Sequence, residues 1–257
     1  MDKMKIIDRI KHLLYVRKKH DIIIFNSYDT LTFFFILLIN VFSITKKYIA
    51  IESDTQLLIS KNYFKRMLKY FYLSFVFQNN HVFGLAGGNY SHKDLFRYYG
   101  MKEDRIFLLP MMVDNSKFYV EKKKFPKPFT FLFVGRLVFE KGVDLYVEVV
   151  KSIAPYYPDW NFGLTGSFRL GDNNNVNSYA SKVIKNFNNI VSQAKFYGFK
   201  DHDFVERKMK TASIIIIPSL WKEPFGLVAA EAMSNGIAII ASKVGGIPEI
   251  VKNNGNL

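Results

Sequence analysis

Short runs of β-branched and aromatic residues alternate along the chain with longer segments whose apolar residues recur at helical spacing. In the second half, we expect strands at 129–134, 214–217 and 237–242, and helices at 143–153 and 226–235. The strand segments are almost wholly apolar, which is typical of parallel strands buried on both faces. Their alternation with helices therefore predicts βαβ units and an α/β fold.

The first half repeats this rhythm more faintly and predicts a second parallel sheet. Strands are expected at 21–25, 48–51, 81–85 and 106–109, and helices at 30–42, 61–75 and 92–99. The longest apolar run of the chain lies in the helix at 30–42. It has about a dozen residues, too few to cross ~30 Å of hydrocarbon, so we expect a buried helix there.

A polar stretch with two prolines at 115–128 separates the halves and is typical of an interdomain linker. We therefore expect one domain at 1–128, which includes this linker, and a second domain at 129–257.

Two carboxylates mark the strand–helix–strand unit of the second half. Glu223 directly precedes the expected helix, and Glu231 lies about two turns further on, some 80° around the helix axis. Open α/β sheets bind ligands at this carboxyl end of their strands. The first N–H groups of the helix attract anions such as phosphate, and they belong to Phe225, Gly226, Leu227 and Val228. In the alternative interpretation, Glu223 only caps the helix and Glu231 is solvated.

A second charged group follows the strand at 129–134. Arg136 and Lys141 lie in a turn that begins at Gly135, and glycine lets backbone approach a ligand closely. A fixed guanidinium and a mobile ammonium suit a diphosphate. In the alternative interpretation, both are surface charges that pair with Glu140 or Asp144.

Together these segments resemble the retaining glycosyltransferases of the GT-B fold, specifically family 4. The matching motifs are Gly135-Arg136 with Glu140-Lys141-Gly142, Gly163 to Gly166, Phe196-Tyr197-Gly198, Pro218-Ser219, the segment from Glu223 to Ala232, and Val244-Gly245-Gly246-Ile247-Pro248-Glu249. They occur in the family's order across 129–251. The resemblance implies two Rossmann-like parallel-sheet domains that face a cleft.

The resemblance also implies roles for the charged residues in transferring a hexose-type sugar with retention of configuration. Arg136 and Lys141 would contact the donor pyrophosphate and stabilise the leaving nucleoside diphosphate. Glu223 would bind hydroxyls of the transferred sugar, and Glu231 would bind the ribose hydroxyls.

The remaining donor contacts implied by the resemblance come from backbone and one aromatic segment. The N–H groups at 225–228 would cradle the phosphates, and Gly135 would lie against the donor. The base would lie against residues 196–199, which include Tyr197 and Gly198. The donor would be a UDP- or GDP-sugar co-substrate, and no separate cofactor is expected.

No metal is expected in catalysis. The sequence offers no Asp-x-Asp pair beside the expected donor site, because Asp201-His202-Asp203 is predicted to be a polar loop. The five histidines form no expected ligand cluster, and the chain has no cysteine.

Both ends of the chain depart from the family pattern. Nothing before Asp21 resembles the family's opening strand and glycine-rich loop, and relatives normally continue beyond Leu257 into helices that return to the first domain. We therefore expect a glycosyltransferase truncated at both ends, with an incomplete N-terminal domain. The alternative function is a truncated, non-catalytic remnant that binds nucleotide sugars.

The turn at 51–54 stands where many relatives carry a histidine near the transferred sugar. Asp54 or Glu52 would take a hydroxyl-binding role there. The alternative is that Ser53 or Asp54 is a plain helix N-cap.

Positive charge is concentrated in the first half. Residues 1–128 hold 22 Lys and Arg against 11 Asp and Glu, a net charge of +11, whereas residues 129–257 hold 14 against 11, a net +3. Such a domain favours peripheral contact with an anionic membrane and a glycan or lipid-linked acceptor, as in envelope or surface polysaccharide biosynthesis. Simple solvated faces are the alternative.

The absence of cysteine suits a reducing cytoplasm, so we expect a cytoplasmic protein, peripheral on the inner face of the membrane. A nucleic-acid partner is not expected. The aromatic residues lie in apolar runs instead of alternating with Lys and Arg, and no nucleic-acid motif occurs.

Overall fold

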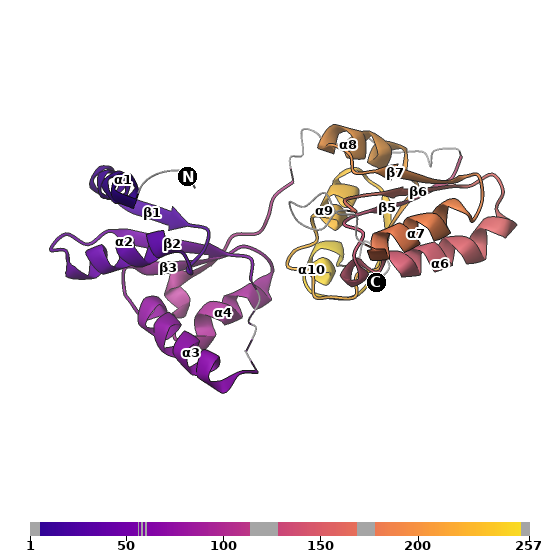
Figure 1. The fold of residues 1–257 in the computed structure, drawn as a ribbon. Coiled ribbons are helices and arrows are strands. Elements are labelled where there is room, and N and C mark those ends of the chain that lie inside the picture. The colour runs from indigo at the N-terminus through magenta and orange to yellow at the C-terminus, as the bar shows by residue number, and fades with distance from the viewer. Residues whose placement is uncertain are drawn as a thin grey trace. The chain divides into compact units, whose positions relative to one another are not determined.

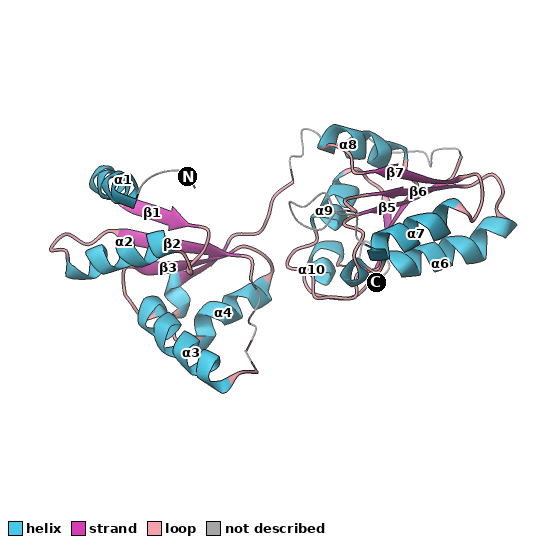
Figure 2. Ribbon diagram, viewed as in Figure 1, coloured by secondary structure: helices cyan, strands magenta, loops and turns pink. Residues whose placement is uncertain are grey.

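The computed structural model describes residues 6–55, 57, 59, 61–113, 128–168 and 178–252. The chain divides into two compact units, Met1–Met111 and Met112–Leu257. In each unit the strands lie together and helices pack around them (Figures 1 and 2). The predicted linker at 115–128 lies outside the described residues except for Pro128, so the domain boundaries stay a prediction.

The first unit contains a parallel sheet in the order β1-β2-β3-β4. Its strands are β1 (Ile22–Phe25), β2 (Tyr48–Ser53), β3 (Val82–Ala86) and β4 (Ile106–Leu108), and its helices are α1 (Ile6–Lys19), α2 (Leu31–Phe42), α3 (Tyr63–Phe77) and α4 (Lys93–Tyr98). All seven elements expected from the sequence are confirmed, with ends shifted by at most two residues. The helix α1 was not predicted, because its charged residues interrupt every apolar run.

The helix α2 is buried on one face only. Phe33, Ile36 and Leu37 are buried in the core with β2, whereas Leu31 and Phe42 are 77% and 83% exposed. The prediction of a buried helix was therefore wrong for its outer face. A helix that packs on one side of a sheet can bury only one stripe, whatever its total hydrophobicity.

The second unit contains a parallel sheet in the order β7-β6-β5-β8-β9. Its strands are β5 (Thr130–Val134), β6 (Asn161–Thr165), β7 (Ala194–Gly198), β8 (Ile214–Ile217) and β9 (Ala238–Ala241), and its helices are α6 (Val143–Ile153), α7 (Ser178–Asn188), α8 (His202–Thr211), α9 (Leu227–Ser234) and α10 (Ile247–Val251). The predicted strands and helices of this half are confirmed.

Alternate residues of β5 enter two different cores. Phe131 and Phe133 pack with the helices α6 and α7, and the intervening Leu132 packs in a cluster that includes residues of α8, α9 and α10. Successive side chains of a strand point to opposite faces, so helices cover both faces of this sheet. The result is the doubly wound arrangement that the apolar strands predicted.

The strand order reverses direction between β5 and β8. From β5 the chain builds outward through β6 and β7, and it then returns to place β8 and β9 on the other side. In open α/β sheets, the carboxyl ends of strands at such a reversal form the ligand crevice. The loops after β5 and β8 are therefore expected to form the ligand-binding site.

Among the helices of the described residues, none combines the length and the apolar character needed to cross a bilayer.

Candidate functional site

The loops after β5 and β8 are joined by an ion pair whose carboxylate is buried. The ammonium Nζ of Lys141 lies 2.6 Å from Oε1 and 2.8 Å from Oε2 of Glu223, which is 82 residues further along the chain. The Oγ of Ser219 donates a second hydrogen bond to Oε1, at 2.6 Å. Glu223 is only 6% exposed. Lys141 therefore does not pair with its sequence neighbours, and that alternative is wrong for this residue.

The same two loops are in direct backbone contact. Gly142 adopts φ +63°, and the carbonyl oxygen of Pro218 lies 1.9 Å from the position that a Cβ at residue 142 would occupy. The N–H of Leu220 donates to the carbonyl of Glu140 at 2.9 Å. Only glycine fits at position 142, and its fit sets the distance between Lys141 and Glu223.

Two glycines after β9 support the loop that carries Glu223. Gly245 adopts φ +56°, and a Cβ there would lie 2.2 Å from the backbone oxygen of Glu223. The N–H of Gly246 donates to that oxygen at 2.8 Å. The sequence identified this glycine pair as a motif without a role, and the structure shows that it positions the carboxylate.

Lys141 and Arg136 are held differently. The ammonium of Lys141 lies 5.3 Å from the ring centroid of the half-exposed Trp221, as well as against Glu223. The side chain of Arg136 is exposed, and the structure gives it no hydrogen bond or ion pair within the described residues. A guanidinium without a protein partner is available to a ligand anion.

The N-terminus of α9 has no side-chain cap. Its N-cap residue is Gly226, at φ +107°, and Glu223 points away to Lys141. Within the described residues, no protein acceptor is found for the N–H groups of Leu227 and Val228. The capping alternative for Glu223 is therefore wrong. The turn from Phe225 onward offers unpaired donors at the positive end of a helix.

Glu231 lies in the second turn of α9. Its side chain is 16% exposed, so the solvated alternative is wrong, and its Oε1 lies 3.6 Å from Nε2 of His202. Burial raises the pKa of the Glu231 carboxyl, and the nearby His202 opposes that rise. The estimate of 80° between the two carboxylates does not apply, because α9 begins only at Leu227.

The loops after β5, β6 and β7 meet through glycines. The N–H of Gly135 donates to Thr165 O at 3.1 Å, and a Cβ on Gly166 would lie 1.6 Å from Gly135 O. The carbonyl of Gly198 accepts from Gly166 N at 3.1 Å and from Thr165 Oγ1 at 2.9 Å. Among the described residues, no atom comes within 4 Å of a Cβ built on Gly198, so that part of the chain leaves open space beside this residue.

Tyr197 turns away from that open space. Its ring packs edge-on against Phe204 of α8, with centroids 5.5 Å apart, and lies 4.5 Å from the ammonium of Lys208. Phe199 is exposed. Of the segment predicted to contact a base, Gly198 and Phe199 border open space, whereas the Tyr197 side chain belongs to the packing under α8.

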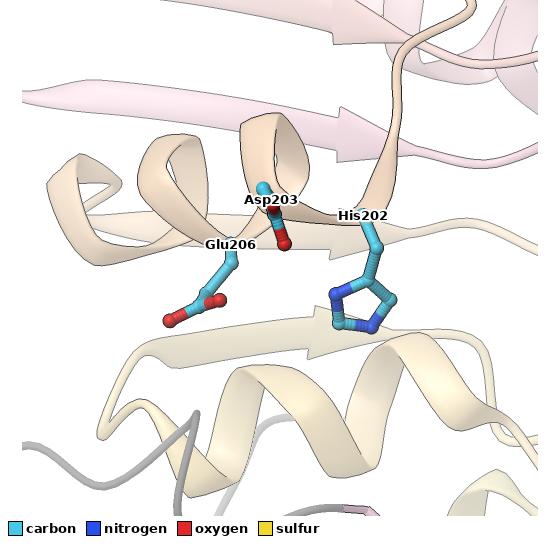
Figure 3. Close-up of side chains that lie close together, drawn as sticks. All are labelled: His202, Asp203 and Glu206. Atoms are coloured by element: carbon cyan, nitrogen blue, oxygen red, sulfur yellow. The ribbon is translucent and has the colours of Figure 1, made fainter.

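The start of α8 brings together three groups that could ligate a metal. His202, Asp203 and Glu206 place one ligand atom each within 4.8 Å of one another, on the same side of the helix (Figure 3). Asp201 caps α8, accepting from Phe204 N at 2.8 Å. The predictions of a polar loop here and of no cluster containing histidine were wrong. Two facts argue against a preformed metal site here. His202 and Asp203 are exposed, and Glu206 forms an ion pair with Lys210.

In the first unit, Asp54 follows β2 and is exposed. The Oγ of Ser53 accepts from Thr55 N at 3.2 Å, and its carbonyl accepts from Gly87 N at 2.8 Å. The next helix, α3, is capped by Asn62 instead. The N-cap alternative for this turn is wrong, and the hydroxyl-binding role of Asp54 stays a prediction.

Residues 114–256, more than half of the chain, match the family model for glycosyl transferases group 1. The chain belongs to this family. A curated relative, an uncharacterized glycosyltransferase of Methanocaldococcus jannaschii, is 38% identical over 122 residues, which are 47% of this chain and 30% of the relative. The phosphatidylinositol N-acetylglucosaminyltransferase gpi3 subunit of Schizosaccharomyces pombe is 28% identical over 151 residues, 58% of this chain and 31% of that protein.

Solved structures extend the similarity over both units of this group 1 family member. The Anabaena protein HepE, solved in complex with UDP, gives a TM-score of 0.72 at 17% identity and covers 97% of this chain and 67% of its own. The fold is thus GT-B, with two Rossmann-like parallel-sheet domains. The curated relatives are longer, and the matched stretch spans about a third of their length.

Proposed function

We propose that this group 1 family member transfers a hexose-type sugar from a UDP- or GDP-sugar to an acceptor, with retention of configuration. The observation that carries the proposal is the Lys141–Glu223 pair at the reversal between β5 and β8. It places an ammonium and a carboxylate beside the uncapped N-terminus of α9. This arrangement suits a ligand that has an anionic diphosphate joined to a polyhydroxylated group.

The chemistry assigned to these groups is stabilisation of the leaving group. As the bond between sugar and diphosphate breaks, negative charge grows on the diphosphate oxygens. Arg136, Lys141 and the N–H groups of Leu227 and Val228 would stabilise that charge where it develops. No protein base is required if the departing phosphate oxygen takes the acceptor proton on the same face. That route retains the anomeric configuration and uses no metal.

The carboxylates would divide recognition of the donor. Glu223 accepts from Lys141 through both oxygens and from Ser219 through only one, so Oε2 retains capacity for a sugar hydroxyl. Glu231 would accept from the ribose hydroxyls, and the open space beside Gly198 would take the base. The HepE structures with UDP and with UDP-glucose support a sugar nucleotide as the ligand class.

The acceptor in this proposal is a glycan or a lipid-linked intermediate of surface polysaccharide synthesis, handled at the cytoplasmic face of a membrane. Two observations support it. Matched relatives include enzymes that act on phosphatidylinositol and on lipopolysaccharide. Residues 1–128 also carry most of the excess positive charge.

The test is donor binding followed by product analysis. Thermal unfolding of the chain with UDP-, GDP- and ADP-sugars, in EDTA, should single out one base, since a ligand at about 100 times its Kd adds about 2.7 kcal/mol of stability. Nuclear magnetic resonance of the transferred sugar should then show the donor's anomeric configuration. Binding that requires a divalent metal, or an inverted product, would contradict the proposal.

A further inference from the structure

The helix α3 is apolar on two opposite faces. Leu73, Val76 and Phe77 are completely buried in the core of the first unit. A second set of large apolar residues on the same helix is exposed to solvent, and it contains Phe64, Leu68, Phe71 and Phe75. Figure 1 shows α3 as one of the outermost elements of its unit. Its exposed residues therefore have no partner within the first unit's core.

The exposed residues form a continuous stripe. They follow one another at intervals of four, three and four residues, so at about 100° per residue they fall within about 60° of one another. The stripe lies roughly opposite the buried face and is roughly 16 Å long at 1.5 Å per residue. Exposed single apolar residues are common, but an aligned row of four on one helix indicates a surface that becomes covered.

The charged residues of α3 and of the segment just before it are all positive. Lys61, Lys65, Arg66 and Lys69 lie at or next to the first two turns of α3, and no acidic residue occurs between Asp54 and Asp94. Phenylalanine and leucine on one face with lysine and arginine alongside are the chemistry of helices that lie in a bilayer interface. The long lysine side chains can reach headgroup phosphates while their stems cover apolar surface.

We propose that the outer face of α3, which we name the α3 stripe (Phe64, Leu68, Phe71 and Phe75), docks on an anionic lipid bilayer. The phenylalanine rings enter the boundary between headgroups and acyl chains, and the four cations contact lipid phosphates. A second copy of this chain is a poorer occupant, because a symmetric contact would bring two sets of four cations together. This inference goes beyond the proposed transfer reaction and requires no donor.

The experiment uses the full chain and vesicles of two compositions: phosphatidylcholine alone, and phosphatidylcholine with phosphatidylglycerol in equal parts. Co-sedimentation should show binding to the anionic vesicles that weakens as salt is raised. The variant Phe64→Gln/Phe71→Gln should bind at least about tenfold more weakly. Removal of two cations in Lys61→Gln/Lys65→Gln should reduce binding about fivefold per charge.

A matched control comes from the second unit. Leu145→Gln/Val149→Gln changes two exposed apolar residues one turn apart on α6 and should leave vesicle binding unchanged. Circular dichroism and thermal unfolding of every variant show that it is folded. The charge variant keeps the test valid if the phenylalanine variant does not fold.

A tryptophan at position 71 locates the contact directly. The chain has two tryptophans, Trp160 and Trp221, both in the second unit, so Phe71→Trp adds a reporter on the stripe. Brominated anionic lipid should quench the added fluorescence. Three results would each overturn the proposal: no wild-type binding to anionic vesicles, unchanged binding by both stripe and charge variants, or a wild-type dimer in solution that Phe64→Gln/Phe71→Gln dissociates.

Discussion

The two carboxylates of the candidate site lie in different surroundings. Glu223 sits in a loop and is fixed by a lysine 82 residues away and by a serine hydroxyl. Glu231 sits on a helix, and its neighbour is the imidazole of His202 at 3.6 Å. One carboxylate is held by a lysine ammonium, whereas burial raises the pKa of the other. Two residues of one sequence motif thus depend on different parts of the fold.

The largest effect is expected from removing the cation beside Glu223. Lys141→Met leaves a buried carboxylate without its charge partner, which costs about 3–5 kcal/mol of stability. The control is Arg136→Met, which removes an exposed cation and should change stability by no more than about 0.5 kcal/mol. Denaturant unfolding measures both variants. Equal stability loss would show that the ion pair does not organise the loop, and both variants should still lose affinity for a nucleoside diphosphate.

A second pair of variants compares the backbone around the two carboxylates. Gly142 and Gly236 both adopt φ +63°, but only Gly142 has a carbonyl 1.9 Å from the position of a Cβ. Gly236 closes the helix that carries Glu231, and no atom of the described residues lies within 4 Å of a Cβ built there. Gly236→Ala should cost about 1–2 kcal/mol from its left-handed backbone alone.

Gly142→Ala should cost clearly more, because the Pro218 backbone must also move, and the shift should weaken donor binding. Thermal unfolding and calorimetry with the donor measure the two effects. If Gly142→Ala were no less stable than Gly236→Ala, the close backbone contact between the loops after β5 and β8 would be contradicted.

The smallest effect concerns pH. Burial raises the pKa of Glu231 in the folded protein, so the folded state binds a proton that the unfolded state has already released. The free energy of unfolding should therefore fall as pH rises from about 4.5 through the raised pKa, and the loss should then level off. Glu231→Gln should remove this fall. Both proteins are measured in a His202→Asn background, which removes the neighbouring imidazole. If the free energy of unfolding then varies with pH in the same way in the protein with Glu231 and in the Glu231→Gln variant, burial does not raise the pKa of Glu231.

The sequence predicted the structural features that depend only on residues close together along the chain. The apolar run at 214–217, the small residues of α9 and the closing glycine determine a strand, a helix and its end within about 25 residues. The positions of Glu223 and Glu231 at the carboxyl end of β8 follow from that pattern. The start of α8 was missed, although Asp201 is a favoured N-cap residue, because three polar residues in a row indicated a loop.

The partners of these residues could not be predicted in the same way. Lys141 has acidic neighbours on both sides in sequence, and only the adjacency of β5 and β8 brings Glu223 to it. The support from Gly245 likewise depends on the position of β9 beside β8. The exposure of the outer apolar face of α3 could not be predicted. A buried stripe and an exposed apolar stripe on one helix have the same composition, so the sequence does not distinguish them.

The division of donor recognition between the carboxylates is tested most directly by calorimetric titration of Glu223→Gln and Glu231→Gln with a nucleoside diphosphate and with its sugar derivative. Glu223→Gln should weaken the sugar nucleotide by about 1.5–3 kcal/mol without weakening the diphosphate, because Lys141 stays free to bind it. Glu231→Gln should weaken both ligands equally, because both contain the ribose. Equal weakening of both ligands by Glu223→Gln would contradict the account.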